Sequence, residues 1–158
     1  MKGLSLLALL AIALAGLAGA ASLLFRREAA RGPTSLDRAR VAYADRDFAG
    51  AEALLAGIDS LPADLLRAKI RRDTGRLSEA RDLFAKVLEA EPKNAEAVQG
   101  LAQVYTSLRQ DEFAIPLWRK LCDLRPDAGS WRELALAQVR TKDALGAMTS
   151  IQKSLELD

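Results

Sequence analysis

The sequence contains no histidine and only one cysteine, Cys122, among its 158 residues. The absence of histidine excludes Ser-His-Asp and Cys-His nucleophiles and every metal site that uses an imidazole ligand. A lone cysteine cannot close a disulfide within the chain, and no glycine-rich phosphate loop, acidic calcium loop or paired-cysteine motif is present. We therefore predict that the chain is not an enzyme and has no catalytic residue, no cofactor and no bound metal.

The chain also lacks an excess of charge of one sign over most of its length. From Pro33 onward, 19 Lys and Arg residues stand against 20 Asp and Glu residues. Sequence-independent binding to nucleic acid needs a broad basic surface, which a nearly neutral region does not supply. We therefore predict that nucleic acid is not a partner.

Residues 3–25 carry no charge. As a helix they would reach roughly 35 Å, against about 30 Å of hydrocarbon in a bilayer. Lys2 and the "AGA" at residues 18–20 also resemble a secretory signal with its cleavage site, but the apolar residues run on to Arg26 and Arg27, which favours a retained anchor. We predict a single-pass membrane segment with a basic flank over residues 1–32, in contact with the bilayer through residues 3–25.

The side of the membrane is set by the basic residues around this segment. Only Lys2 precedes it, whereas five arginines follow it: Arg26, Arg27, Arg31, Arg38 and Arg40. This asymmetry favours a cytoplasmic location for residues 33–158. The signal-like "AGA" leaves the extracytoplasmic side open, including an exported envelope protein after signal cleavage.

A nine-residue pattern occurs twice in the second half of the chain. "FAKVLEAEP" at residues 84–92 is followed, 34 residues later, by "WRKLCDLRP" at residues 118–126. Each segment places an aromatic residue and then aliphatic residues on one helical face and ends at a proline. Residues 95–128 as a whole predict two helices joined by a turn at residues 109–112, with Asp111 as the N-cap of the second helix. The repeated unit is a helical hairpin.

A single hairpin cannot bury its apolar stripe, so similar units must stack until their stripes form one core. The pattern resembles the tetratricopeptide repeat; the signature positions of that family are filled by Leu101, Ala102, Tyr105, Ala114, Trp118 and Pro126. Val98 replaces the opening tryptophan, and in the preceding unit Arg71 stands where the family prefers tyrosine. Small residues recur at equal positions and predict close helix crossings: Ala68, Ala80, Ala102, Ala114, Ala135 and Ala147.

The resemblance implies an all-α, right-handed α-solenoid of about four hairpins that follows the membrane segment. Residues 33–158 would form this domain, with hairpins at about residues 35–60, 61–94, 95–128 and 129–158. In such a solenoid the first helices of successive hairpins line a concave groove. The residues that the resemblance places there are Arg40, Tyr43, Lys69, Arg72, Gln99, Gln103, Thr106, Arg132 and Arg140.

A cationic and polar groove suits a protein partner with an acidic or carboxylate-ended peptide, because arginine binds carboxylates through two parallel hydrogen bonds. The alternative is that these are ordinary solvated side chains. A second predicted contact is the outward face of the C-terminal helix, where Met148, Ile151 and Leu155 would bind a partner or a second copy of the chain. We predict a membrane-anchored scaffold or assembly adaptor, with a stoichiometric subunit of a larger membrane complex as the alternative.

Overall fold

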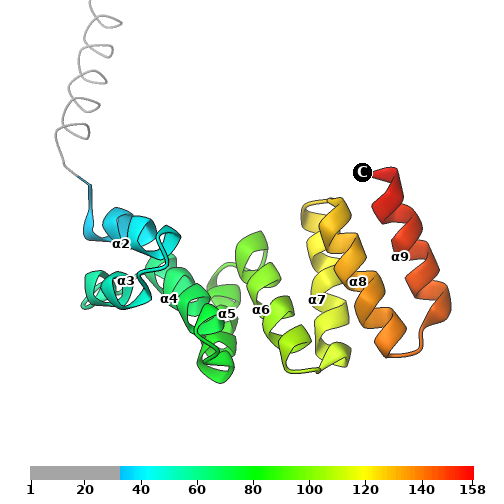
Figure 1. Cartoon of the computed structure of the whole chain (residues 1–158), viewed down its shortest axis with the longest axis horizontal. Coiled ribbons are helices and arrows are strands. Elements are labelled where there is room, and N and C mark those ends of the chain that lie inside the picture. Colours follow the sequence, from blue (N-terminus) through cyan, green and yellow to red (C-terminus); the bar gives the residue numbers. More distant parts are fainter. Residues whose placement is uncertain (1–32) are drawn as a thin grey trace, which may run out of the picture.

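The computed structural model describes residues 33–158 and folds them into eight α-helices, with no strand in this range. The helices are α2 (Ser35–Ala44), α3 (Phe48–Leu55), α4 (Leu61–Asp73), α5 (Leu77–Ala90), α6 (Ala95–Ser107), α7 (Asp111–Leu124), α8 (Ala128–Arg140) and α9 (Ala144–Glu156). They pair into hairpins, and each helix packs against the next one along the chain. Figure 1 shows the hairpins in a row, with the C-terminus at the end opposite α2.

The first helix of every hairpin begins at a polar cap. The capping side chains are Thr34, Ser60, Asn94 and Asp127, and each accepts a hydrogen bond from the backbone N–H three residues later. Thr34 and Asp37 also form a reciprocal capping box. Because the first turn of a helix leaves its N–H groups without intrahelical partners, these caps fix where each hairpin begins.

The turn inside every hairpin contains one residue with left-handed backbone. These residues are Arg46, Gly75, Arg109 and Lys142, with φ of 61°, 79°, 58° and 66°. The conformation reverses the chain just after a helix ends. Glycine adopts it without steric cost, whereas for a residue with a Cβ it costs about 1–2 kcal/mol of conformational energy. The backbone is therefore strained in the three turns that place arginine or lysine at this position.

The core runs along the row rather than forming one central mass. Its three buried clusters centre on Leu55, Phe84 and Trp118, which are the largest fully buried side chains of their clusters. The clusters around Phe84 and Trp118 share partly buried neighbours such as Tyr105. The alanines that predict close crossings are all 3% exposed or less: Ala68, Ala80, Ala102, Ala114, Ala135 and Ala147.

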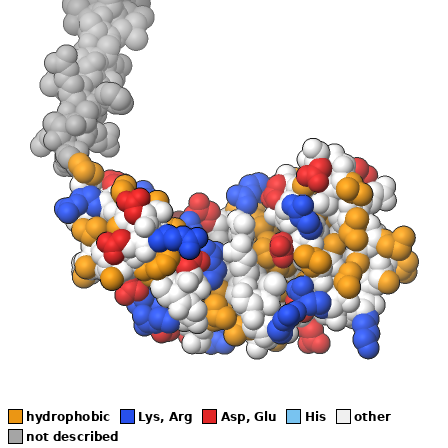
Figure 2. Space-filling view, in the orientation of Figure 1, with side chains coloured by type: hydrophobic (Ala, Val, Ile, Leu, Met, Phe, Trp, Pro, Cys, Tyr) orange, Lys and Arg blue, Asp and Glu red, His pale blue; other side chains and the backbone are white. Residues whose placement is uncertain are grey.

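The prediction of an all-α solenoid is confirmed for residues 33–158. The predicted membrane segment at residues 3–25 lies outside the described residues. Within residues 33–158, every helix is too short or too polar to cross a bilayer. Figure 2 shows acidic and basic side chains interspersed over the visible face of the row, in keeping with its nearly neutral composition.

Candidate functional site

The first helices α4 and α6 present equivalent residues on one face. Both helices have 13 residues and bury an alanine at the eighth position, so their ninth and twelfth residues point in the same direction. These positions hold Lys69 and Arg72 in α4, and Gln103 and Thr106 in α6. All four belong to the predicted groove.

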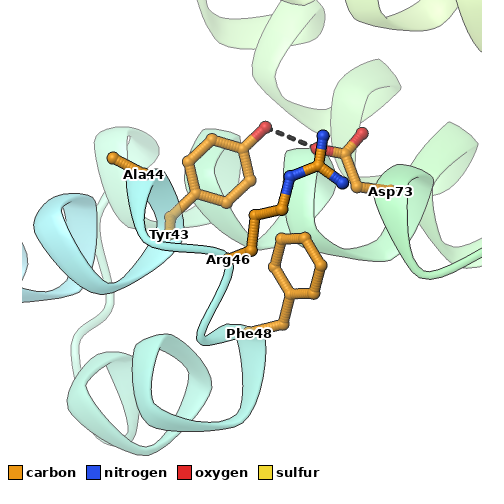
Figure 3. A pocket seen from close by; sticks show the side chains of 5 residues that line it. All are labelled: Tyr43, Ala44, Arg46, Phe48 and Asp73. Atoms are coloured by element: carbon orange, nitrogen blue, oxygen red, sulfur yellow. Dashed lines mark hydrogen bonds between the residues drawn. The ribbon is translucent and has the colours of Figure 1, made fainter.

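Two hollows open along this face and meet at Asp73. The first has a volume of about 450 Å³ and lies between α2, α3 and α4; Figure 3 shows its lining of Tyr43, Ala44, Arg46, Phe48 and Asp73. The second has about 460 Å³ and is lined by Arg72, Asp73, Gln103, Thr106, Ser107, Trp118 and Glu133. We call the face that α2, α4, α6 and α8 present around these two hollows the first-helix groove. It spans residues from all four hairpins.

A line of hydrogen bonds crosses the floor of the first-helix groove. The Tyr43 hydroxyl donates to Asp73 Oδ2 at 2.6 Å, and Arg72 Nε donates to Asp73 Oδ1 at 2.8 Å. Arg72 Nη1 also donates to the Gln103 side-chain oxygen. Because Tyr43, Arg72 and Gln103 come from α2, α4 and α6, this line fixes three successive first helices relative to one another.

Asp73 is the negative centre of this line. Partial burial would raise the pKa of Asp73, but the hydrogen bonds from Arg72 and Tyr43 outweigh burial and hold that pKa below its ordinary value. Burial, followed by the hydrogen bond to Asp73, raises the pKa of the Tyr43 hydroxyl. Asp73 is therefore ionised and Tyr43 neutral at neutral pH.

The turn residue Arg46 adds a further positive charge beside Asp73. Its charge contributes to the lowered pKa of Asp73, and Figure 3 shows its side chain extending towards that carboxylate. The Tyr43 and Phe48 rings flank the same hollow with their centroids 5.9 Å apart. This end of the groove thus combines two aromatic rings with the opposite charges of Asp73 and Arg46.

Most of the other predicted groove residues already have partners in the chain. Lys69 pairs with Glu96 at 2.7 Å, Gln99 accepts from Arg125 at 3.0 Å, and Arg40 pairs with Asp37 at 3.3 Å. Arg140 binds both oxygens of Asp111 through its Nε and Nη2, at 2.7 and 2.6 Å. The first-helix groove is consequently a surface of paired charges rather than an array of free cations.

The Arg140–Asp111 pair corrects the sequence interpretation of α7. The N-cap of this helix is Gln110, and Asp111 is its first residue. Asp111 is only 8% exposed, and the Arg140 guanidinium holds the pKa of that carboxyl below its ordinary value. Asp111 therefore ties the start of α7 to the end of α8 instead of capping α7.

The α8 end of the same face is apolar, which the sequence interpretation missed. α8 also has 13 residues, and its ninth and twelfth residues are Leu136 and Val139. Their side chains are 47% and 57% exposed. Arg132 is exposed on this helix and has no acidic partner among residues 33–158. Comparing equal positions of the three helices would have identified Leu136 and Val139 from the sequence.

The tryptophans and the cysteine serve packing. Trp118 is 2% exposed and its Nε1 donates to Thr106 at 3.1 Å; Trp131 packs against the same cluster. Burial, with the nearby charges of Asp127 and Asp123, raises the pKa of Cys122 to about 11. Within residues 33–158 no group of three or more Cys, Asp or Glu side chains is placed to hold a metal ion.

The second predicted contact lies on α9, at the end of the row. Met148, Ile151 and Leu155 are 69%, 47% and 70% exposed. Their helix is packed on one side by α8. The structure therefore separates the two predicted sites, since the first-helix groove lies on α2, α4, α6 and α8.

Comparison with known protein families gives a match to part of this chain. The family profile described as tetratricopeptide repeat matches residues 71–134, from the end of α4 into α8. A comparison with curated protein sequences gave no significant match. Residues 71–134 are thus similar to the tetratricopeptide repeat, and the helical hairpins continue on both sides of them.

Solved structures of tetratricopeptide-repeat proteins have a similar fold. A crystal structure of MamA superposes with a TM-score of 0.72 at 18% identity, covering 84% of this chain and 83% of that chain. MamA from Desulfovibrio magneticus RS-1 gives 0.72 at 18% identity, covering 78% of this chain and 73% of that chain. YrrB, described as a TPR protein with an unusual peptide-binding site, gives 0.69 at 10% identity, with coverages of 78% and 67%. At these identities the likeness shows the fold.

Proposed function

We propose that the chain is a protein-protein interaction scaffold that holds an extended segment of a partner protein in the first-helix groove. The supporting observation is the line of hydrogen bonds through Tyr43, Asp73, Arg72 and Gln103, which holds three first helices in one fixed surface. A surface fixed before binding loses little conformational freedom when a partner docks. The proposal includes no catalytic role.

The chemistry of the groove suits a partner segment with both apolar and acidic groups. At the α8 end, Leu136 and Val139 offer exposed apolar surface beside Arg132. A carboxylate that binds Arg132 makes a new ion pair without displacing one, and arginine takes carboxylates bidentately. At the α4 end the same carboxylate would compete with Asp73 for Arg72. We therefore place the acidic or carboxylate-ended part of the partner at Arg132.

Anchorage in a membrane completes the proposal. Its support is the uncharged sequence of residues 3–25, which matches the thickness of a bilayer. The arginines that follow favour the cytoplasmic side for the solenoid. The alternatives are a stoichiometric subunit of a larger membrane complex and an envelope protein that is exported with cleavage of the segment.

The proposed groove is tested by crosslinking in intact cells. A photoreactive residue replaces Ser107, which lines the groove and is exposed, or Arg119, which is exposed on the second helix α7. We expect a protein neighbour to be captured from position 107, and its capture to fail when Arg132→Glu is introduced alone or together with Arg72→Glu.

The matched control reverses two charges on second helices, Arg81→Glu and Arg119→Glu, and should leave capture from position 107 intact. Capture that persists in the groove variant, or that occurs only from position 119, refutes the proposed groove. Equimolar recovery of the neighbour from detergent favours the subunit alternative over a transient adaptor.

A further inference from the structure

α9 carries an apolar face that no residue of 33–158 covers. Leu145, Met148, Ile151 and Leu155 are 81%, 69%, 47% and 70% exposed, and Figure 2 shows hydrophobic side chains gathered over this end of the row. The other side of α9 packs against α8 through small buried residues such as Ala147. A continuous exposed apolar face of this kind marks an interaction site.

The spacing of the face matches a second copy of itself. Ala144, Met148, Ile151 and Leu155 follow one another at intervals of four, three and four residues, which places them on one narrow helical stripe. This spacing reads the same in both directions along the helix. We call these four residues the α9 seam.

Two α9 helices that run antiparallel bring complementary side chains together across the seam. Ala144 then lies opposite Leu155 of the other copy, and Met148 lies opposite Ile151. A small residue thus meets a large one at each end of the seam, and two large apolar side chains meet on either side of its centre. A two-fold axis between residues 149 and 150 generates every one of these pairs twice.

The charges of α9 do not oppose this arrangement. Its two ionised side chains, Lys153 and Glu156, pair with each other at 2.8 Å and lie off the seam. Antiparallel helices also place the positive end of one dipole beside the negative end of the other. No charge is therefore buried in the seam, and the capping residue Asp143, which comes level with Glu156 of the other copy, lies off it.

From these observations we infer that the α9 seam is a homodimer interface in which a second copy of the chain packs antiparallel about a two-fold axis. A helix of 13 residues is only about 20 Å long, so the seam is smaller than the ~800 Å² per partner of a standard interface. We expect a dimer with a micromolar dissociation constant. The inference does not depend on the proposed groove, which lies on other helices.

Two complementary charge variants test the antiparallel register. Met148→Lys alone and Ile151→Glu alone should each weaken the dimer by ~10-fold or more, because each places a charge opposite an apolar side chain. Mixing the two variants should restore association, since Lys at 148 then faces Glu at 151 of the other copy. Sedimentation equilibrium of the 158-residue chain in detergent measures the masses, with residues 1–32 identical in all samples.

Thr149→Lys is the matched control, because it adds the same charge on an exposed neighbouring residue that lies off the seam. It should leave the dissociation constant within about twofold of the original value. A monomeric parent chain at high concentration, unchanged association of either single variant, or no recovery in the mixture would each overturn the inference. Far-UV circular dichroism should be the same for all variants, since the changed residues are exposed.

Discussion

Gly100→Ala is expected to destabilise the protein, although alanine is the better helix former. Gly100 lies inside α6 and is buried. A Cβ at this position would fall within 2.7 Å of three ring atoms of Phe84: Cζ, Cε1 and Cε2. Phe84 comes from α5, is fully buried, and packs among the residues of its cluster. The ring cannot withdraw without moving its neighbours.

The magnitude follows from two opposing effects. Replacing glycine by alanine in a helix interior gains about 1 kcal/mol, whereas forcing an extra carbon into a packed core costs about 1–3 kcal/mol and more when the neighbour has no room. With three ring atoms in contact, we expect the free energy of unfolding to fall by ~1–2 kcal/mol. The melting temperature should then decrease by ~3 °C or more.

Urea unfolding followed by far-UV circular dichroism measures the effect, and Phe84→Leu tests its cause. Leucine lacks the three ring atoms, so Gly100→Ala made together with Phe84→Leu should be neutral or stabilising relative to Phe84→Leu alone. Gly129→Ala is the comparison variant: its added Cβ meets a single close atom, Asp127 Oδ1 at 3.1 Å, so it should cost less stability than Gly100→Ala. If Gly100→Ala stabilised the parent chain, the described contact between α5 and α6 would be refuted.

Three further predictions concern single side chains. Asp111→Asn should lower the free energy of unfolding by ~1–3 kcal/mol at pH 7, because it removes the charge that Arg140 binds. The folded-state pKa of Asp111 is lowered, so the difference in free energy of unfolding between the parent chain and the variant is complete above about pH 5 and shrinks as the pH falls through that pKa. Urea titrations at about pH 7 and pH 3 measure this difference, and equal values at the two pH values would contradict the prediction. Arg109→Gly should raise the stability by about 0.5–1 kcal/mol by relieving the left-handed turn, and a lower urea midpoint would contradict this. Cys122, with its pKa raised to about 11, should react with a thiol reagent at pH 8 only in denaturant, and rapid labelling of the native chain would refute its burial.

The hairpin architecture could be predicted because its signals are local and repeated. Phe84 and Trp118 stand 34 residues apart, and each precedes a proline at the same distance. The alanines at equal positions, such as Ala102 and Ala114, are buried as close helix crossings require. The apolar face and the end of a helix depend on residues within one or two helical turns of each other. Helical periodicity and stop residues therefore identify them from a single sequence.

Pairs between distant residues could not be predicted in the same way. Asp111 looks like a cap in the sequence, but its partner Arg140 lies 29 residues later. Arg71 replaces the tyrosine that the repeat pattern prefers, and the structure pairs it with Glu52 of α3 and Glu79 of α5. Nothing local to these residues specifies their partners, because the pairing depends on how neighbouring hairpins stack.

The left-handed turns are a further case. Gly75 is the residue that such a turn favours, but Arg46, Arg109 and Lys142 adopt the same conformation with a Cβ. These three turns contain no glycine or asparagine, the residues that most often adopt this conformation. The turn geometry is imposed by the packing of the two helices that it joins, and this packing outweighs the local preference.

The polar contacts along the groove have a spacing close to that of the repeat. Tyr43 with Asp73, Arg72 with Gln103, and Lys69 with Glu96 are separated by 30, 31 and 27 residues. These contacts bind each hairpin to the next, so the surface that we propose for a partner also holds the solenoid together. A charge change at Arg72 or Lys69 therefore affects stability as well as binding. Arg132 makes no such contact within residues 33–158, so Arg132→Glu alone should reduce partner capture at unchanged stability.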